Sequence, residues 1–392
     1  MNRRDFIKIG LTGMTAVAFS SAIKIPGIFN QTEALAAQVT LELSITDAML
    51  ETVDLNQTYI WAFADLTGPK FPGPVIFARE GDTIRLRVTN NLDEDHAVAV
   101  TDTRISSGII RPGQRVDLDF NAPPAGTYIY YDPLNAPVNR VMGLNGTLIV
   151  LPGSGGELTP YTGPPAPIDR LFRDLGNSAE FPGSRWDSAR TWIWHMHNID
   201  PRFSAMAEPL GAPPINRIQF RREFLPRYFF ISGKQGFFSA HDPNISPHGR
   251  VGQPALLRWV NTGMSTHSLH PHFNHVFILS VNNEPQDNLF LVDAFTLPPL
   301  SRVDALMPFI RPPDIPPVAV LKGGSNPNRL IRLDAPEELA LVLADGVPLS
   351  PFHYSMHCHT EMSQTMAGGN YPIGGAVVHL ELHGDIDGVE FP

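Results

Sequence analysis

Two short stretches near the end of the chain hold most of its candidate metal-ligating side chains. They are His267-Ser-Leu-His270-Pro-His272 and His357-Cys358-His359, and the second contains the single cysteine of the sequence. Side chains alternate between the two faces of a β-strand, so His357 and His359 share one face while Cys358 points to the other. The same parity groups His270 with His272 and places His267 on the opposite face.

Four imidazoles can therefore converge on one face of a sheet, while His267 and Cys358 meet on the other. Imidazole nitrogens and a thiolate are ligands for copper or zinc rather than for calcium or magnesium. Copper precedes zinc in the order of affinities for such sites, so the pattern predicts a copper site. The competing interpretation is a set of packed histidines that bind no metal.

The composition indicates what kind of fold must position these side chains. The 392 residues include 38 prolines and 32 glycines, with many short β-branched runs between them, which favours an all-β chain with long loops. A single cysteine excludes an internal disulfide. The net charge of −10 and the absence of a basic tract argue against nucleic acid as a partner.

The N-terminus has the order of an export signal. Arg3-Arg4-Asp5-Phe6 is followed by a modestly apolar run and by Ala34-Leu-Ala36, a candidate cleavage site. The paired arginines are typical of a twin-arginine signal, so residues 1–36 are predicted to be a signal peptide and the mature protein to be periplasmic. No later apolar run is long enough to span a membrane.

The remainder of the chain reads as one unit repeated twice. Gly81–Asn90 is similar to Gly252–Asn261, and each is followed by a histidine, His96 or His267. Thr58–Asp65 is also similar to Thr191–Asn198. Strands at short spacing between Pro/Gly turns predict two Greek-key β-sandwiches.

We place the first domain at 38–155, a linker at 156–188 and the second domain at 189–392, with insertions at about 199–250 and 282–350 that are too proline-rich for regular strands. Only the second domain carries the ligands. In the first, the segment that begins at His96 continues with Ala97 to Thr101, and Tyr131-Asp132-Pro133 stands where the second domain has His357, Cys358 and His359.

These motifs and the order of the strands resemble the multicopper oxidase family. The resemblance implies two cupredoxin-like domains and copper as the cofactor. It implies that His267 and Cys358 are type 1 copper ligands, that His270 is the type 2 ligand, and that His272, His357 and His359 are type 3 ligands. It also implies a small-molecule or metal-ion reductant, dioxygen as a further partner, and a homotrimer with the site between subunits.

The chain departs from the family pattern at two positions after the cysteine. Where the family has a further histidine and an axial methionine, this chain has Ser363 and Gly368. The first domain also lacks the four histidines that a trinuclear cluster needs. We therefore predict an exported copper-binding oxidoreductase with a partial, type 2-like copper site in its second domain. The alternative is a non-catalytic periplasmic scaffold, or a copper storage or delivery protein, of the same fold.

Weaker candidates lie outside the two histidine stretches. His195 and His197 alternate on one predicted strand, and a structural or surface role is favoured for both. Glu361 continues the parity of His357 and His359, so we expect it to accept a hydrogen bond from a ligand or to bind the metal directly.

Overall fold

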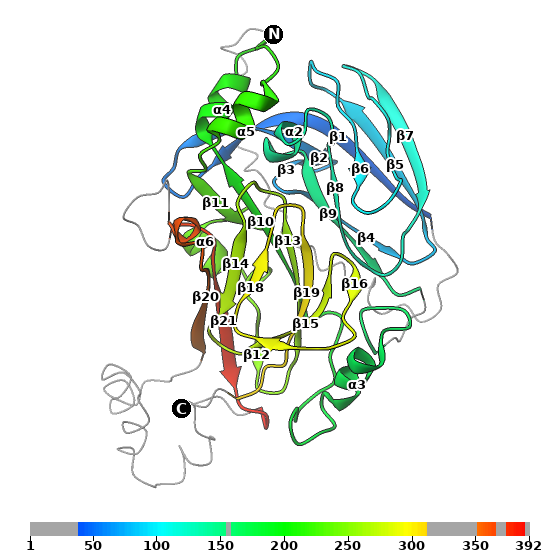
Figure 1. The fold of residues 1–392 in the computed structure, drawn as a ribbon, viewed down its shortest axis with the longest axis vertical. Helices are drawn as coiled ribbons and strands as arrows, with labels where there is room; N and C mark the ends of the chain where they lie inside the picture. The colour runs from blue at the N-terminus through cyan, green and yellow to red at the C-terminus, as the bar shows by residue number, and fades with distance from the viewer. Residues whose placement is uncertain (1–37, 154–157, 312–350, 366–373, 389–392) are drawn as a thin grey trace.

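Two β-sandwiches lie side by side in the computed structural model, which describes residues 38–153, 158–311, 351–365 and 374–388 (Figure 1). The predicted signal peptide and Gly368 lie outside the described residues. The prediction of an all-β chain with two cupredoxin-like sandwiches is confirmed.

The first sandwich pairs a five-stranded and a four-stranded sheet. The five-stranded sheet has the order β3 (Gly68–Lys70), β2 (Gln57–Asp65), β1 (Gln38–Glu51), β5 (Thr83–Asn90) and β7 (Arg115–Asn121). The other has the order β4 (Gly73–Arg79), β9 (Asn145–Leu151), β8 (Gly126–Tyr131) and β6 (Ala99–Val100). Side chains such as Ile84, Leu86 and Val88 alternate inward from β5 and fill the space between the sheets.

The second sandwich is built in the same way. Its larger sheet has the order β11 (Tyr228–Ile231), β10 (Thr191–Ile199), β13 (Ala255–Asn261), β19 (Arg302–Met307), β15 (Val276–Val281) and β16 (Glu284–Pro285), with β17 (Leu291–Val292) also on β15. The facing sheet has the order β12 (His248–Arg250), β21 (Val377–Gly384), β20 (Phe352–Cys358), β14 (His267–Pro271) and β18 (Phe295–Leu297). Its core includes the stacked rings of Trp194 and Trp259.

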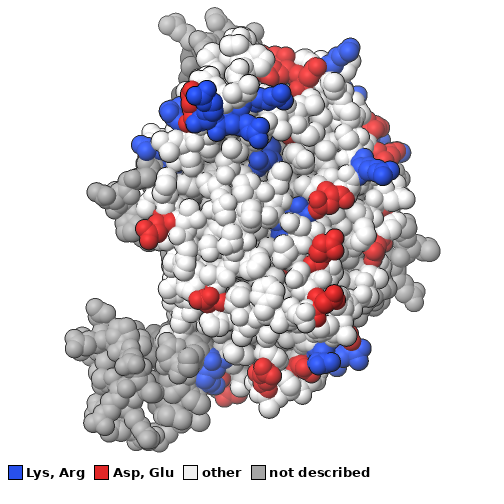
Figure 2. Space-filling model, in the orientation of Figure 1, with Lys and Arg blue, Asp and Glu red and all other residues white. Residues whose placement is uncertain are grey.

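Short helices connect the strands. They are α2 (Val138–Val141), α3 (Ala166–Asp174), α4 (Pro201–Ala207), α5 (Arg217–Glu223), α6 (Gly236–Ala240) and the 3-10 turn η2 (Glu361–Gln364). Helix α3 lies in the predicted linker and packs Ile168 and Phe172 against Leu256 of the second sandwich. Figure 2 shows a largely uncharged face, with Lys and Arg atoms gathered at the end where α4 and α5 lie. Among the helices of the described residues, none combines the length and apolar character that crossing a bilayer requires.

The pairing of strands confirms the internal repeat and corrects one part of its alignment. β1 runs parallel to β5, as β10 runs parallel to β13, so β10 is the counterpart of β1. The predicted match of Thr58–Asp65 with Thr191–Asn198 is therefore wrong, because it pairs β2 with β10. The two segments have similar sequences because both are buried strands with aromatic residues, not because they occupy equivalent positions in the two sandwiches.

The expectation of strand-free insertions at 199–250 and 282–350 is also wrong for the described parts. The first contains β11 and β12, and β19 in the second lies at the centre of the larger sheet. The six residues of β19 are all buried, which explains how this strand forms between proline-rich turns.

Candidate metal centre

Strands β14 and β20 position the candidate ligands. They pair antiparallel, with His270 opposite His357 and Leu269 opposite Cys358. Leu269 and Cys358 are fully buried in the core, so the residues that alternate with them point to the outer face of the sheet. The backbone N–H of His359 donates to the carbonyl of Ser268 and extends this pairing by one residue.

Three imidazoles come together on the outer face. One nitrogen from each of His270, His272 and His357 lies within 4.8 Å of those of the other two. The Nε2 atoms of His272 and His357 are 2.9 Å apart, within hydrogen-bond distance. The ring of His359 lies 4.6 Å from that of His270 between centroids, although His359 does not belong to the group of three. Among the described residues, this is the only such group of His, Cys, Asp or Glu side chains.

Two neighbouring groups orient these rings. The Nδ1 of His270 donates to the backbone carbonyl of Asp293 at 2.9 Å, which leaves Nε2 as its ligand atom. The side-chain amide of Gln364 contacts Nδ1 of His357 at 3.1 Å and the carbonyl of Cys358 at 2.8 Å. Neither residue was predicted from the sequence, because their link to the ligands comes only from the folded chain.

The surroundings of two imidazoles on the outer face, those of His272 and His357, favour the neutral form. Partial burial, followed by the proximity of the neighbouring histidines, lowers the pKa of His272. Partial burial also lowers the pKa of His357, with His270 and His359 adding to the effect. Only a neutral imidazole has a lone pair for a metal ion, so the fold holds these side chains in the form that binds.

On the core face, His267 and Cys358 meet as their parity predicts. The distance from Nδ1 of His267 to Sγ of Cys358 is 3.4 Å, and both residues are fully buried. The sulfur also accepts from the backbone N–H groups of Ser268 and Thr360, at 3.2 and 3.4 Å. Two backbone N–H groups therefore point at the sulfur.

The two faces differ in how well they fit copper. A type 1 site needs two imidazoles and a thiolate, and the core face supplies one of each. Ser363, where a second imidazole is expected, is buried and donates to the carbonyl of Thr360. The outer face supplies three convergent imidazoles, which fit a type 2-like copper centre.

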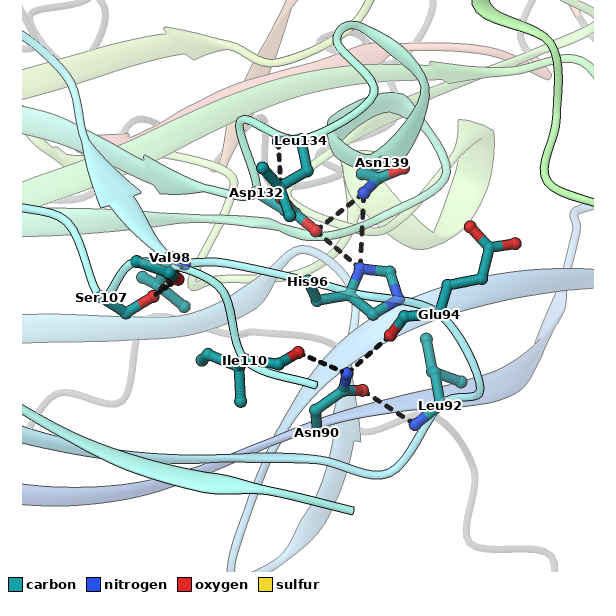
Figure 3. Close-up of polar contacts among 11 residues, drawn as sticks. Asn90, Leu92, Glu94, His96, Val98, Ser107, Ile110, Asp132, Leu134 and Asn139 are labelled. Atoms are coloured by element: carbon teal, nitrogen blue, oxygen red, sulfur yellow. Dashed lines mark hydrogen bonds and ion pairs between the residues drawn. The ribbon is translucent and has the colours of Figure 1, made fainter. Parts of the chain in front are cut away.

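The same position in the first sandwich holds a different set of side chains (Figure 3). His96 donates from Nδ1 to Oδ2 of Asp132 at 2.6 Å, and both are fully buried. Asn139 donates to the same oxygen at 2.9 Å. Ala99 pairs with Tyr131 at the register where His270 pairs with His357, so the outer face of the first sandwich has no counterpart of that imidazole pair.

His195 and His197 have a structural role as buried, hydrogen-bonded side chains. Both are buried, and Thr262 contacts Nε2 of His195 at 2.7 Å and Nδ1 of His197 at 2.8 Å. Their other nitrogens contact Thr147 at 2.9 Å and the carbonyl of Val141 at 2.9 Å. Burial lowers the pKa of His197 to about 3. With both ring nitrogens occupied, neither residue is a metal ligand here.

Glu361 begins η2 and is exposed. Its carboxylate is not part of the group formed by His270, His272 and His357. The structure therefore gives no support to the expectation that it binds the metal directly.

Comparison with known proteins shows a likeness in the first sandwich. Residues 66–155 match the family model for multicopper oxidases. Most of the first sandwich is therefore similar to multicopper oxidases. The resemblance read from the histidine motifs of the second half is thus confirmed by a match that lies in the first half.

Curated relatives agree with this assignment. The chain is 34% identical over 161 residues to the copper-containing nitrite reductase of Alcaligenes xylosoxydans xylosoxydans, covering 36% of this chain and 48% of that protein. It is 34% identical over 105 residues to the L-ascorbate oxidase of Nicotiana tabacum, covering 24% of this chain and 18% of that protein. The matches thus span about half or less of these relatives.

A solved structure shows the same fold over most of both chains. The blue copper oxidase from Nitrosomonas europaea superposes with a TM-score of 0.60 at 18% identity, covering 88% of this chain and 86% of the other. At that identity the likeness speaks for the arrangement of strands alone.

Proposed function

We propose that this chain is an exported copper-dependent oxidoreductase of the multicopper oxidase type, with a type 2-like copper centre on the outer face of its second sandwich. The observation that carries the proposal is the convergence of ligand nitrogens from His270, His272 and His357 within 4.8 Å. A bound copper ion would supply one-electron exchange between a small-molecule or metal-ion reductant and dioxygen.

The protein side chains prepare this site for the ion. The Asp293 carbonyl holds the ring of His270, and the Gln364 amide holds that of His357. The lowered pKa values of His272 and His357 reduce competition from protons. His272 and His359 are exposed, which leaves one side of the cluster open to a reductant.

We assign no type 1 (blue) copper to the core face. His267 and Cys358 alone do not complete the trigonal set that such a site needs. The centre would therefore exchange electrons directly with a reductant at the surface.

The location and assembly are proposed from the sequence. The Arg3-Arg4 pair and the following apolar run support export through the twin-arginine route to the periplasm. The family resemblance supports a homotrimer with the site between subunits. Sedimentation of the purified protein tests the trimer, and a monomer at micromolar concentration would contradict it.

Oxygen uptake tests the activity. Copper-loaded protein should consume dioxygen in the presence of a phenol or a metal-ion reductant, and His272→Ala should abolish this. His275→Ala is the matched control, because His275 is an exposed histidine of the same segment outside the cluster. Equal oxygen uptake by wild type and His272→Ala would contradict the proposal.

A second function, copper storage or delivery without turnover, is favoured by one observation. The first sandwich has Ala99 and Tyr131 at the register of His270 and His357, so it cannot offer a matching set of imidazoles to a shared cluster. Stoichiometric copper binding with no oxygen uptake by the wild type would favour this second function. The absence of bound copper would favour a non-catalytic scaffold.

A further inference from the structure

The outer face of the same sheet carries a second group of potential ligands. On β21, Val378, Leu380 and Leu382 are fully buried in the core. The residues between them, His379 and Glu381, therefore point outward, and His383 continues the alternation. This outward row lies beside β20, the strand that carries His357.

Strand register brings β20 into the group. His353 pairs with Glu381, and Ser355 pairs with His379. His353, Ser355 and His357 share the outer face of β20, so one serine position separates the second group from the first. His241, the residue that ends α6, lies over His379 from outside the sheet, with ring centroids 4.8 Å apart. We call the set His241, His353, His379, Glu381 and His383 the β21 cluster.

The side chains of the β21 cluster are already in contact. Oε2 of Glu381 lies 3.1 Å from Nε2 of His383, and Oε1 lies 3.9 Å from Nδ1 of His353. The ring of His379 lies 5.5 Å from that of His353. The rings of His241, His379 and His353 are thus separated by 4.8 and 5.5 Å, within the 4.6 to 5.5 Å range of neighbouring rings in the first cluster.

Two details indicate ligand atoms without another use. The Nδ1 atom of His379 is buried and has no hydrogen-bond partner. Leaving a buried polar atom unpaired costs free energy, which a bound ion would recover. The Nδ1 of His241 donates a hydrogen bond to the carbonyl of Phe237 at 2.9 Å, so the Nε2 atom of His241 keeps its lone pair for a metal ion.

We propose that the β21 cluster is a second metal site, which binds a divalent transition-metal ion through His379, Glu381 and the exposed imidazoles beside them. Imidazole nitrogens with one carboxylate suit Cu²⁺ or Zn²⁺, with Cu²⁺ bound more tightly. No three residues of this cluster place their ligand atoms within 4.8 Å of one another, in contrast to His270, His272 and His357. Binding therefore requires the side chains of His353 and His383, each 44% exposed, to rotate toward the ion.

Metal titration of the full-length protein tests this site separately from the first. The protein is purified without a polyhistidine tag, stripped with a chelator, and titrated with Cu²⁺ and then with Zn²⁺ by calorimetry and equilibrium dialysis. We expect two ions for the wild type and one for the double variant His353→Ala/His383→Ala. Glu381→Gln keeps the shape of the side chain and should weaken the affinity for the second ion at least about tenfold.

Two further variants separate failure of this proposal from failure of the proposed function. His272→Ala should lose the first ion and keep the second, whereas His275→Ala should keep both. A wild type that binds a single ion, lost with His272→Ala and unaffected by the double variant, would overturn the second site alone. A single ion lost only with the double variant would support the β21 cluster and overturn the first site. Thermal unfolding of each metal-free variant checks that the fold is kept.

Discussion

The Nε2 atoms of His272 and His357 lie 2.9 Å apart although the residues are separated by 85 positions in the sequence. The pairing of β14 with β20 sets this distance, since it places His270 opposite His357 and carries the chain on to His272. Two imidazoles so close cannot both hold a proton at these nitrogens. The contact therefore favours a shared proton in the metal-free protein and a shared ion when metal is present.

The first prediction concerns the protonation of this pair. His272 and His357 should titrate below the ordinary histidine value in metal-free protein, because burial and neighbouring imidazoles disfavour the charged form. Removing one neighbour with His270→Ala should raise the pKa of both. Nitrogen-detected NMR titration measures this, with His275→Ala as the control. Unchanged titration in His270→Ala would show that the imidazoles do not interact.

The second prediction concerns the core face. Copper-loaded wild type should lack the intense visible colour of a thiolate-copper bond, and Cys358→Ala should retain its copper at the outer cluster. The variant loses a small buried side chain, at a cost of roughly 1 kcal/mol in the free energy of unfolding. Absorption spectra and denaturant unfolding measure both effects. A strong colour that disappears in Cys358→Ala would instead establish Cys358 as a ligand.

The third prediction concerns the buried pair in the first sandwich. The carboxylate of Asp132 accepts hydrogen bonds from His96, from Asn139 and from the backbone N–H of Leu134. Asp132→Ala should therefore lower the free energy of unfolding by about 3 kcal/mol or more, since it leaves buried donors without an acceptor.

A surface ion pair supplies the control for that variant. Asp119 holds Arg85 through two contacts of 2.6 and 2.7 Å on an exposed strand face. Asp119→Ala should lower the free energy of unfolding far less than Asp132→Ala does, because solvent screens the pair. Similar losses in the two variants would mean that the buried pair contributes no more than a surface one.

The fourth prediction is a loss of stability in acid caused by His195 and His197. Burial lowers the pKa of His197 to about 3 and that of His195 well below its ordinary value. The unfolded imidazole takes up a proton near pH 6.5, whereas the folded one stays neutral, so the unfolded state binds more protons below that pH. Stability should fall as pH drops from 6.5 toward 3, by about 2 kcal/mol between pH 6.5 and 5 for His197, with a further loss of the same sign from His195.

The variant His197→Gln isolates this effect. It should be less stable at neutral pH, because the contacts to Thr262 and to the carbonyl of Val141 are altered. Its stability should also depend less steeply on pH. Urea unfolding at several pH values measures the slope, and a slope equal to that of the wild type would assign the acid sensitivity to other groups.

Much of the site follows from the sequence because a strand has a period of two. Parity alone separates His357 and His359 from Cys358, and the buried pattern of β20 bears this out. The side-chain contact between His267 and Cys358 on the core face follows from the same rule applied to β14. The repeated order of predicted strands in the sequence likewise indicates two sandwiches with the same topology.

Other features depend on contacts that sequence patterns do not encode. The likeness of β2 to β10 is local, whereas the equivalence of β10 to β1 appears only from the parallel pairing with β13 and β5. Asp293 supports the ligands from a loop and Gln364 from the turn η2, and the sequence pattern does not fix the path of either segment. The β21 cluster joins histidines from a helix end and two strands, which only the fold brings together.

Anomalous diffraction at the copper absorption edge, from crystals of copper-loaded protein, tests the central claim most directly. The account predicts a copper peak on the outer face of β14 and β20, bonded to nitrogens of His270, His272 and His357. No peak between these three side chains, or a peak held only by His267 and Cys358 on the core face, would contradict it.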